Sequence, residues 1–444
     1  MSTEQMLNIA VEGCAHGELD VIYDTIRMME AEKGIKFDLL ICCGDFQAVR
    51  NYEDLDAMAV PVKYRDIKQF HQYYSGEKVA PVLTIFVGGN HEASSHLYEL
   101  PYGGWVAPNI YYMGFSNVIN FAGLRIGGLT GIYKKRDYQT GHYEVPPFNE
   151  GDKRSFYHVR NADVFKLQQL RENAIDIFVG HDWPKGIENY GDRESLFRYK
   201  PFLRDDPDFG NPPSMDLLLK LKPSYWFAAH MHAKFAAIVG HPSETPNPRV
   251  TKFLALSKPL PGQNFIQAIS IPHDGSPKVL QYDPEWLVVV ARTKHLMSSS
   301  SDRVILPQVI GYEAKEEQMR EVQAKVSLSI PNNFVRTARA TIETVEFTPL
   351  RQGEENPQTV EILKMIQRCI DITSASSNAP SDTPSSHDQR EEPKAQARDK
   401  PTENSEEIDL DDLSSEPAAA PAQTEKAEEE PKKFKLNLPP PVNT

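Results

Sequence analysis

Side chains that can bind divalent metals occur in five short clusters, each directly after an apolar run. In chain order these are Cys14 with His16, Asp45, Asn90 with His91, His181 with Asp182, and His230 with His232. A single buried histidine is more often a hydrogen-bonded core residue than a ligand, and an aspartate after glycine is also common in turns. Five successive clusters in the frames Cys-x-His, Gly-Asp, Gly-Asn-His-Glu, Gly-His-Asp and His-x-His form a far more specific pattern. Together they predict one shared metal site.

The chemistry open to such a site is metal-assisted hydrolysis. Two divalent metals about 3.5–4 Å apart lower the pKa of a bridging water, bind phosphoryl oxygens and stabilise charge on a leaving oxygen. Imidazole and carboxylate ligands suit Zn, Mn and Fe(II), whereas the softer thiolate of Cys14 favours Zn or Fe over Mg. The cysteine therefore bears on the choice of metal.

The apolar runs before these clusters have the length and composition of buried strands. Residues 7–11, 38–43 and 82–87 are each followed closely by glycine, and residues 18–32 have the apolar spacing of a helix. Strands mixed with helices predict an α/β core, whose functional side chains lie in loops at strand ends and meet in one crevice. Further strand-like runs cover residues 118–121, 124–128, 175–179, 225–229 and 235–239.

Residues 130–160 differ from the rest of the first half because they are aromatic and basic and have no clear period. The segment is long for a plain connection, so it is a candidate binding loop. Single-stranded RNA is bound by stacking of bases on aromatic rings and by contacts of Lys or Arg with phosphates. The side chains that offer this are Tyr133, Lys134, Lys135, Arg136, Tyr138, His142 and Tyr143.

The second half contains a further folded region and then a tail. Strand-like runs at residues 253–256, 265–271 and 286–290, followed by helical spacing over 360–370, predict a region extending to about residue 372. From residue 374 to the end there are 16 acidic and eight basic residues, so this segment holds −8 of the total charge of −14. It is rich in Ser, Pro, Glu and Ala and nearly lacks aromatic residues, which predicts disorder.

Size and composition are those of a globular protein. The chain has 444 residues, of which 40% are hydrophobic and 25% charged. No stretch approaches the roughly 20 apolar residues that cross a bilayer, and no secretory leader is recognisable. The four cysteines do not suggest a disulfide framework, and Cys42 and Cys43 lie in an apolar run that we expect in the core. These features predict a cytosolic or nuclear protein without membrane partners.

The five frames resemble the metallophosphoesterase superfamily, whose pattern is Asp-x-His, Gly-Asp, Gly-Asn-His-Asp/Glu, His and Gly-His-x-His, over residues 7–233. The resemblance implies a β-sandwich flanked by helices and two divalent metals, Fe(II)/Zn or Mn. It also implies a metal-activated hydroxide as nucleophile, His91 as general acid, and Glu92 as the residue that orients it. One metal would be held by Cys14, His16, Asp45 and His232, and the other by Asp45, Asn90, His181 and His230, with Asp45 bridging.

Two positions depart from the superfamily pattern, since Cys14 stands where most relatives have Asp and Ala229 where Gly is usual. The cysteine resembles the lariat debranching enzymes in particular. So do Gly44-Asp-Phe-Gln-Ala-Val-Arg-Asn51, the stretch 130–147, His181-Asp-Trp-Pro184 and the region after Pro246.

This closer resemblance implies hydrolysis of the 2′–5′ phosphodiester at the branch point of excised intron lariat RNA. The domains would be a catalytic domain (residues 1–245) with a lariat recognition loop (about 130–160), a debranching-type C-terminal domain (246–372) and a disordered acidic tail (373–444). We further expect a monomer in the nucleus, with any protein partners bound through the tail. The Lys-Lys-Phe-Lys run from Lys432 is more simply solvated charge than a nuclear address.

Two alternatives keep the same fold. A protein phosphatase would have an Asp-Arg-Gly motif near Asp45, whereas this chain has Ala48-Val-Arg-Asn51; a 3′–5′ nuclease is a similar alternative. A metal-free scaffold that only binds partners would lack several ligands, whereas here every ligand position holds a competent donor.

Overall fold

The computed structural model describes residues 5–207, 209–242, 248–308, 311–341, 350 and 354–375. Met1–Asp382 form one compact unit, and the rest of the chain lies outside the described ranges. The predicted tail therefore falls almost entirely outside what the structure describes, and so does the basic run at Lys432. Helix α11 (Pro357–Ala375) continues into the first residues of the range predicted as tail.

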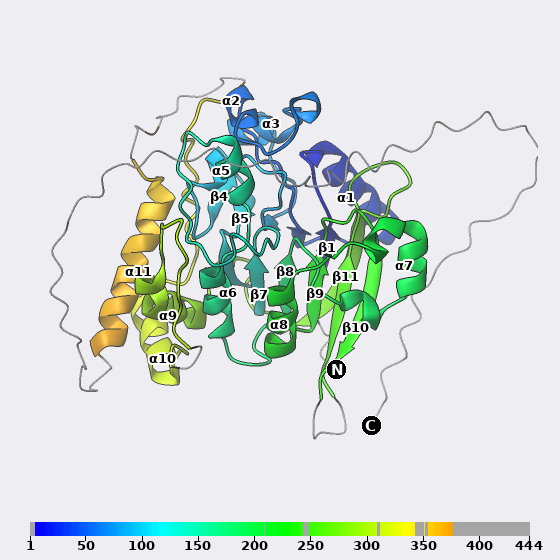
Figure 1. The fold of residues 1–444 in the computed structure, drawn as a ribbon. Helices are drawn as coiled ribbons and strands as arrows, with labels where there is room; N and C mark the ends of the chain where they lie inside the picture. The colour runs from blue at the N-terminus through cyan, green and yellow to red at the C-terminus, as the bar shows by residue number, and fades with distance from the viewer. Residues whose placement is uncertain are drawn as a thin grey trace, which may run out of the picture. The chain divides into compact units, whose positions relative to one another are not determined.

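Two β-sheets lie at the centre of this unit (Figure 1). The six-stranded sheet has the order β12 (Ile266–His273), β1 (Gln5–Glu12), β2 (Leu39–Cys42), β3 (Thr84–Phe86), β5 (Ile110–Tyr112) and β4 (Gly104–Ala107). The seven-stranded sheet has the order β10 (Phe235–Gly240), β11 (Val250–Ala255), β9 (Tyr225–Ala228), β8 (Ile177–Gly180), β7 (Leu124–Leu129), β6 (Ser116–Phe121) and β13 (Leu280–Tyr282). In each sheet the inner strands that lead to the predicted metal ligands pair in parallel.

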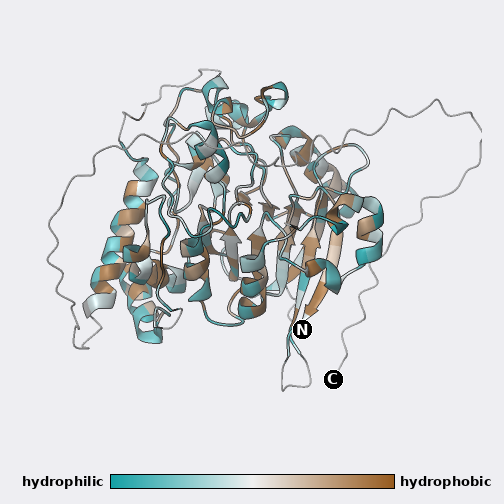
Figure 2. Cartoon of the chain, viewed as in Figure 1, coloured by the Kyte–Doolittle hydropathy of each residue, from teal (hydrophilic) through white to brown (hydrophobic). Residues whose placement is uncertain are grey.

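Along each strand, side chains point alternately to opposite sides. One set faces the space between the two sheets, and the other faces the helices on the outside. Leu7 and Ile9 of β1 share a buried core with Ile177 of β8 in the other sheet. Ala10 of β1 instead packs in a second core with Leu19 of helix α1 (Leu19–Lys33). Strands buried on both faces read as continuous apolar runs, which is the pattern of the sequence. Figure 2 shows this concentration of hydrophobic residues on the strands.

The remaining helices surround the sheets or extend the unit beyond them (Figure 1). They are α2 (Tyr52–Leu55), α3 (Phe70–Ser75), α4 (Ser94–Leu97), α5 (Glu150–Ser155), α6 (Asn161–Gln168), α7 (Arg193–Tyr199), α8 (Pro212–Leu221), α9 (Pro284–Thr293) and α10 (Glu316–Lys325). Short 3-10 helices are η1 (Val62–Tyr64), η2 (Ile187–Tyr190), η3 (Pro201–Arg204) and η4 (Lys294–Leu296). None of the helices in the described ranges is long and apolar enough to cross a membrane.

Most of the expected elements are confirmed, and one is wrong. The predicted helix over 18–32 is α1, and the apolar runs before each ligand cluster are strands. The run 286–290 was expected to be a strand, but it lies in helix α9. Asp283 caps that helix by accepting the N–H of Trp286, and Pro284 occupies its first turn. The helix-starting signal of Asp-Pro outweighs the strand preference of the β-branched residues that follow it.

The region after Pro246 completes both sheets. Strand β11 lies between β10 and β9, and β12 pairs with the whole length of β1. Buried polar contacts add to these pairings, because Arg125 of β7 donates to Asp283 and to Glu285 at 2.8 Å. Cys42 and Cys43 are fully buried, as their place in an apolar run predicts.

Candidate metal centre

Backbone hydrogen bonds join the loops that follow the strands. The N–H of His16 donates to the carbonyl of Asp45 at 2.6 Å, which joins the loops after β1 and β2. The N–H of Ala229 donates to the carbonyl of His181 at 2.9 Å, which joins the loops after β9 and β8. Strand ends that are adjacent in a parallel sheet thus present their side chains in one place.

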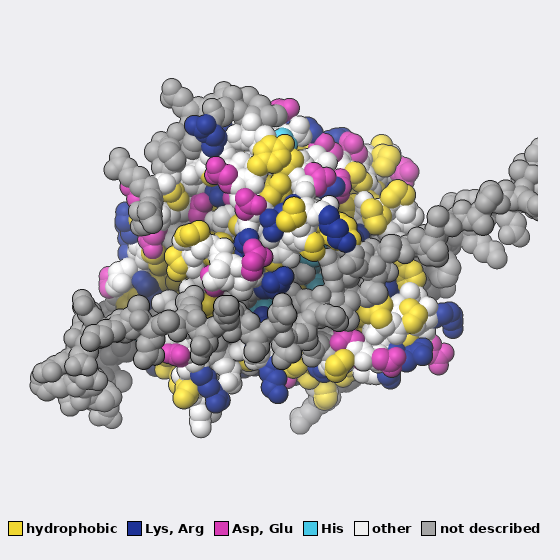
Figure 3. Space-filling model, turned by 45° about the horizontal axis from the view of Figure 1, so that its top comes forward, with side chains coloured by type: hydrophobic (Ala, Val, Ile, Leu, Met, Phe, Trp, Pro, Cys, Tyr) yellow, Lys and Arg dark blue, Asp and Glu magenta, His cyan; other side chains and the backbone are white. Residues whose placement is uncertain are grey.

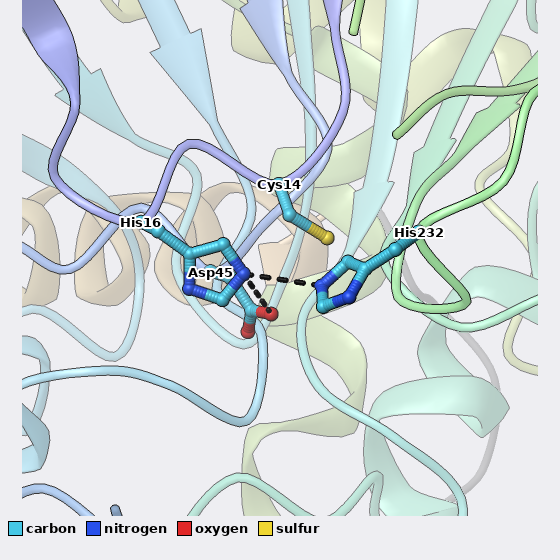
Figure 4. A group of neighbouring side chains, drawn as sticks. All are labelled: Cys14, His16, Asp45 and His232. Atoms are coloured by element: carbon cyan, nitrogen blue, oxygen red, sulfur yellow. Dashed lines mark hydrogen bonds and ion pairs between the residues drawn. The ribbon is translucent and has the colours of Figure 1, made fainter. Parts of the chain in front are cut away.

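The first group of predicted ligands comes together closely. One donor atom from each of Cys14, His16, Asp45 and His232 lies within 4.8 Å of the other three. Figure 4 shows the four side chains pointing toward a common centre. Nε2 of His16 is 3.1 Å from Nε2 of His232 and 3.6 Å from Oδ2 of Asp45. Two imidazole nitrogens, a carboxylate and a sulfur form a donor set suited to a divalent transition metal.

The second predicted group meets on the other side of Asp45. Nε2 of His181 lies 3.2 Å from Oδ1 of Asp45 and 3.2 Å from Oδ1 of Asn90. The ring of His230 lies 4.9 Å from that of His181, centroid to centroid. Asp45 therefore approaches one group with Oδ2 and the other with Oδ1, which is the arrangement required of a bridging carboxylate.

Hydrogen bonds around the centre orient its donors. Nδ1 of His181 lies 2.8 Å from the carbonyl oxygen of Cys43. Because Nδ1 donates to this carbonyl, Nε2 is the ring nitrogen that faces Asp45 and is available to a metal. The sulfur of Cys14 accepts the N–H of His230 at 3.1 Å, which ties the first ligand to the last loop.

Burial and charge control the protonation of these groups. Burial by itself would raise the pKa of Asp45, but the charges of His181 and His91 lower it well below its usual value. Burial and the neighbouring His181 lower the pKa of His230 to about 3, so this imidazole is neutral and able to bind a metal. Burial raises the pKa of the Cys14 thiol, and a bound metal would hold it as thiolate. The donor set therefore fits divalent metals.

Several of these residues have strained backbones. His16, Asp45, His230 and His232 have φ angles of 44°, 45°, 60° and 46°, in the left-handed region that non-glycine residues avoid. Such conformations cost on the order of 1–3 kcal/mol each and persist where the surrounding structure imposes them. Their concentration at the candidate ligands is an independent sign of a functional site.

Two glycines allow the loops to approach this closely. A methyl group on Gly44 would overlap the ring of His181, and one on Gly89 would overlap Oδ1 and the backbone nitrogen of Asp45. Gly44 also has a φ of 110°. Both glycines of the Gly-Asp and Gly-Asn-His-Glu frames are therefore required by space.

His91 lies beside the first group. Its ring centroid is 5.1 Å from that of His16 in an edge-to-face arrangement, and its N–H donates to Oδ1 of Asp45 at 2.9 Å. The backbone is thus fixed to the bridging carboxylate while the half-buried ring stands at the edge of the centre. This position suits a group that reaches the substrate.

Glu92 bonds the backbone of the loops that carry the candidate ligands. Its carboxylate accepts the N–H groups of Gly89 and Phe46 through Oε1 and that of Gln47 through Oε2. Burial raises its pKa to about 7 in spite of these bonds. Glu92 therefore holds together the backbones of two ligand loops, and the expectation that it orients the ring of His91 stays a prediction.

Asp182 and Trp183 support the site in ways that the sequence pattern did not reveal. Oδ2 of Asp182 accepts the N–H of Tyr133 at 3.1 Å, which anchors the start of the 130–160 loop beside His181. The indole N–H of Trp183, fully buried, donates to the carbonyl of Ala229 at 2.6 Å. Burial raises the pKa of Asp182 to about 6, and the N–H of Tyr133 acts against this. The only signal in the sequence was the His-Asp-Trp-Pro motif itself.

The predicted RNA-binding side chains divide into two sets. The rings of Tyr133 and Tyr138 lie 5.4 Å apart, and Lys135 and Arg136 are exposed. Lys134 is close enough to the centre for its charge to lower the pKa of His230, although burial of that histidine has the larger effect.

The other two residues, His142 and Tyr143, hold the base of the loop. His142 bonds Asp163 at 2.7 Å and stacks on Phe115 with ring centroids 3.9 Å apart. The hydroxyl of Tyr143 donates to Ser155 at 3.1 Å. These contacts place both side chains in the base of the loop, and the expectation that they contact RNA stays a prediction.

Two families of known proteins match this chain. Residues 7–234 match the family described as calcineurin-like phosphoesterase, and residues 248–372 match that described as lariat debranching enzyme, C-terminal domain. A lariat debranching enzyme of Danio rerio is 50% identical over 371 residues, covering 80% of this chain and 65% of that protein, just under two thirds of its length. That of Homo sapiens is 49% identical over 370 residues, covering 80% and 68%. That of Caenorhabditis elegans is 46% identical over 389 residues, covering 82% and 78%.

Proposed function

Because this chain belongs to the lariat debranching enzymes, within the calcineurin-like phosphoesterases, we propose that it hydrolyses the 2′–5′ phosphodiester at the branch point of lariat RNA. The products are a 2′-hydroxyl on the branch nucleotide and a 5′-phosphate on the released strand. The observation that carries the proposal is the position of Asp45, whose two carboxylate oxygens face two separate groups of ligands.

Distances among the donor atoms support two ligand sets. Cys14, His16, Asp45 and His232 would hold one ion, and Asp45, Asn90, His181 and His230 would hold the other. Two divalent ions bound there would lower the pKa of a water molecule and stabilise charge on the phosphoryl oxygens. The sulfur of Cys14 favours Zn or Fe(II) at the first position, with Mn as the harder alternative.

His91 supplies the proton that the leaving group needs. The branch nucleotide leaves as a 2′-alkoxide, which is a poor leaving group unless it is protonated as the bond breaks. The ring of His91 stands beside His16 at the edge of the centre, while its backbone N–H donates to Asp45. We assign His91 as general acid because this anchoring holds the ring close to the ligands without making it one of them.

The exposed part of the 130–160 loop binds the branch nucleotide in this proposal. Tyr133 and Tyr138 offer ring faces for a splayed base, and Lys134, Lys135 and Arg136 offer charge for phosphates. Asp182 fixes the start of this loop to the ligand His181. We also propose that the protein is a monomer that acts in the nucleus and that any protein partners bind its tail.

The test is a branched oligonucleotide that contains both 2′–5′ and 3′–5′ linkages, incubated with the purified protein before and after removal of metal by extended dialysis against chelator. We expect cleavage of the 2′–5′ bond alone, loss of activity on metal removal, and recovery on adding Zn, Fe(II) or Mn. The Asp45→Ala variant is the matched control for a contaminating nuclease. Cleavage confined to the 3′–5′ linkages would favour the nuclease alternative and reject the proposal.

A further inference from the structure

We propose that Tyr199, Lys200 and Lys258 form a second RNA-binding surface, on the Cys14–His232 side of the centre, that binds one of the strands leaving the branch. We call these three residues the 199–258 surface. This inference rests on the proposed function, because it assigns a place to a further part of the same substrate. A branch point joins three strands, and the 130–160 loop lies on the His181–His230 side.

A chain of hydrogen bonds connects this surface to the candidate metal ligands. The N–H of Cys14 donates to the carbonyl of Ser257 at 3.2 Å, and the hydroxyl of Ser257 donates to Oε1 of Gln263 at 3.1 Å. The hydroxyl of Tyr199 donates to the same oxygen at 3.1 Å. Tyr199 and the loop that contains Lys258 are therefore held in a fixed relation to Cys14.

The side chains on this surface are those that bind single-stranded nucleic acid. Tyr199 is 54% exposed at the end of helix α7, and its hydroxyl bond fixes the ring while leaving much of it in solvent. Nζ of Lys200 lies 5.3 Å from the centre of that ring. An exposed aromatic ring next to an ammonium group offers stacking for a base and charge for its phosphate.

Two like charges meet at this surface. Partial burial and then the charge of Lys258 lower the pKa of Lys200. Two ammonium groups this close attract an anion more strongly than either does alone, and a phosphodiester is such an anion.

The surrounding segment adds charge of the same sign. From Arg193 to Arg204 there are four basic residues and one acidic residue, although the chain as a whole carries −14. Figure 3 shows Lys and Arg side chains next to histidine side chains near the middle of one face. The acidic residues 374–444 of this chain are a competing occupant, but an exposed stacking ring favours RNA.

The test measures binding of a branched RNA with strands of several nucleotides, using variants built on His91→Ala so that the RNA stays intact. Tyr199→Ala should weaken binding about ten-fold, because stacking on an aromatic ring contributes strongly per base. Tyr199→Phe keeps the ring and should bind within about two-fold of its parent. Lys200→Gln with Lys258→Gln should reduce the slope of log K against log salt by about 1.4, since each lost phosphate contact removes about 0.7 for a single strand.

The matched control is Lys252→Gln, because Lys252 makes a similar contact with Tyr225 at 5.2 Å toward the opposite end of the sheet. It should change neither the affinity nor the slope, and metal per protein should be equal in all variants.

An unchanged slope in the double lysine variant, with Tyr199→Ala binding like Tyr199→Phe, would overturn the 199–258 surface. The proposal would also be overturned if the double lysine variant no longer changed the slope in a chain ending at Ala375. In that case the tail, and not RNA, would be what the 199–258 surface binds. Failure of the wild type to cleave the 2′–5′ bond would instead reject the proposed function, and the two failures are therefore distinct.

Discussion

Asp45 and His91 are adjacent in space, but replacing them should impair different properties of the protein. Asp45 approaches ligands of both groups, whereas His91 contacts the centre through its backbone N–H and the edge of its ring. Loss of a shared carboxylate weakens both metal sites, and loss of a proton donor affects only the chemical step.

We therefore predict that His91→Ala retains its metals and binds branched RNA but cleaves about 10²–10⁴-fold more slowly, the usual contribution of general acid catalysis. Single-turnover rates and metal per protein by elemental analysis test this together. Asp45→Ala is the companion variant and should lose metal as well as rate. If His91→Ala loses its metals as completely as Asp45→Ala, then His91 is a ligand or a structural support.

Cys14→Ser should change which metal the site prefers. The buried sulfur lies within 4.8 Å of the donor atoms of His16, Asp45 and His232, and oxygen in its place is a harder donor. We expect the variant, stripped of metal and reconstituted, to recover relatively more activity with Mn than with Zn when compared with the wild type. An unchanged Zn-to-Mn activity ratio would show that the sulfur does not contact the metal.

At the residue scale, sequence reasoning identified donors better than supporting residues. The predicted donors come together because the strands that lead to them pair in parallel, so that their ends lie at one edge of each sheet. The supporting roles of Glu92 and Asp182 depend on N–H groups of loops distant in the sequence, which no residue type encodes. The aromatic and basic composition of the 130–160 loop likewise does not reveal that the ring of His142 packs on Phe115.

At the scale of elements, the site depends on how closely neighbouring loops can approach. Gly89 lies against Asp45, so Gly89→Ala would push a methyl group into the backbone nitrogen as well as the carboxylate of Asp45. We expect a loss of stability on the order of 1–3 kcal/mol together with a loss of metal. Thermal unfolding and elemental analysis measure the two effects.

Gly240→Ala is the matched control, because a methyl group there meets no other atom and Gly240 lies at the exposed end of β10. It should leave both metal content and melting temperature nearly unchanged. Equal effects of the two substitutions on metal content and melting temperature would mean that the lack of space around Gly89 is not the reason that glycine is required there.

Apolar patterning predicted the inner strands because each is buried on both faces, between the second sheet and the helices. It failed at α9, where a five-residue apolar run fits a buried strand and a buried helix equally well. Strands β4 and β5 were also missed, since the short segments Gly104–Ala107 and Ile110–Tyr112 are too brief for a period to appear.

At the scale of the whole molecule, the sheets depend on strands that come late in the chain. A chain ending at Ala375 keeps every strand and helix that the structure describes, so we expect its melting temperature and debranching rate to match those of the full chain. A chain ending at His241 lacks β11 from the interior of one sheet and β12 from the edge of the other. It should be insoluble or unfolded.

Circular dichroism, sedimentation and single-turnover assays of both truncations test this prediction. A soluble and active chain ending at His241 would show that β11 and β12 are dispensable. A large fall in the melting temperature of the chain ending at Ala375 would show that the tail stabilises the folded unit.

The pairing of β1 with β12 also affects how the protein is made. All eight residues of β1, Gln5–Glu12, pair with Ile266–His273. During translation at about 5–20 residues per second, the first strand waits on the order of tens of seconds for this partner to leave the ribosome. Throughout that interval its edge is an open template for strands of other nascent chains. We therefore expect newly made molecules to need chaperones more than the stability of the finished enzyme would suggest.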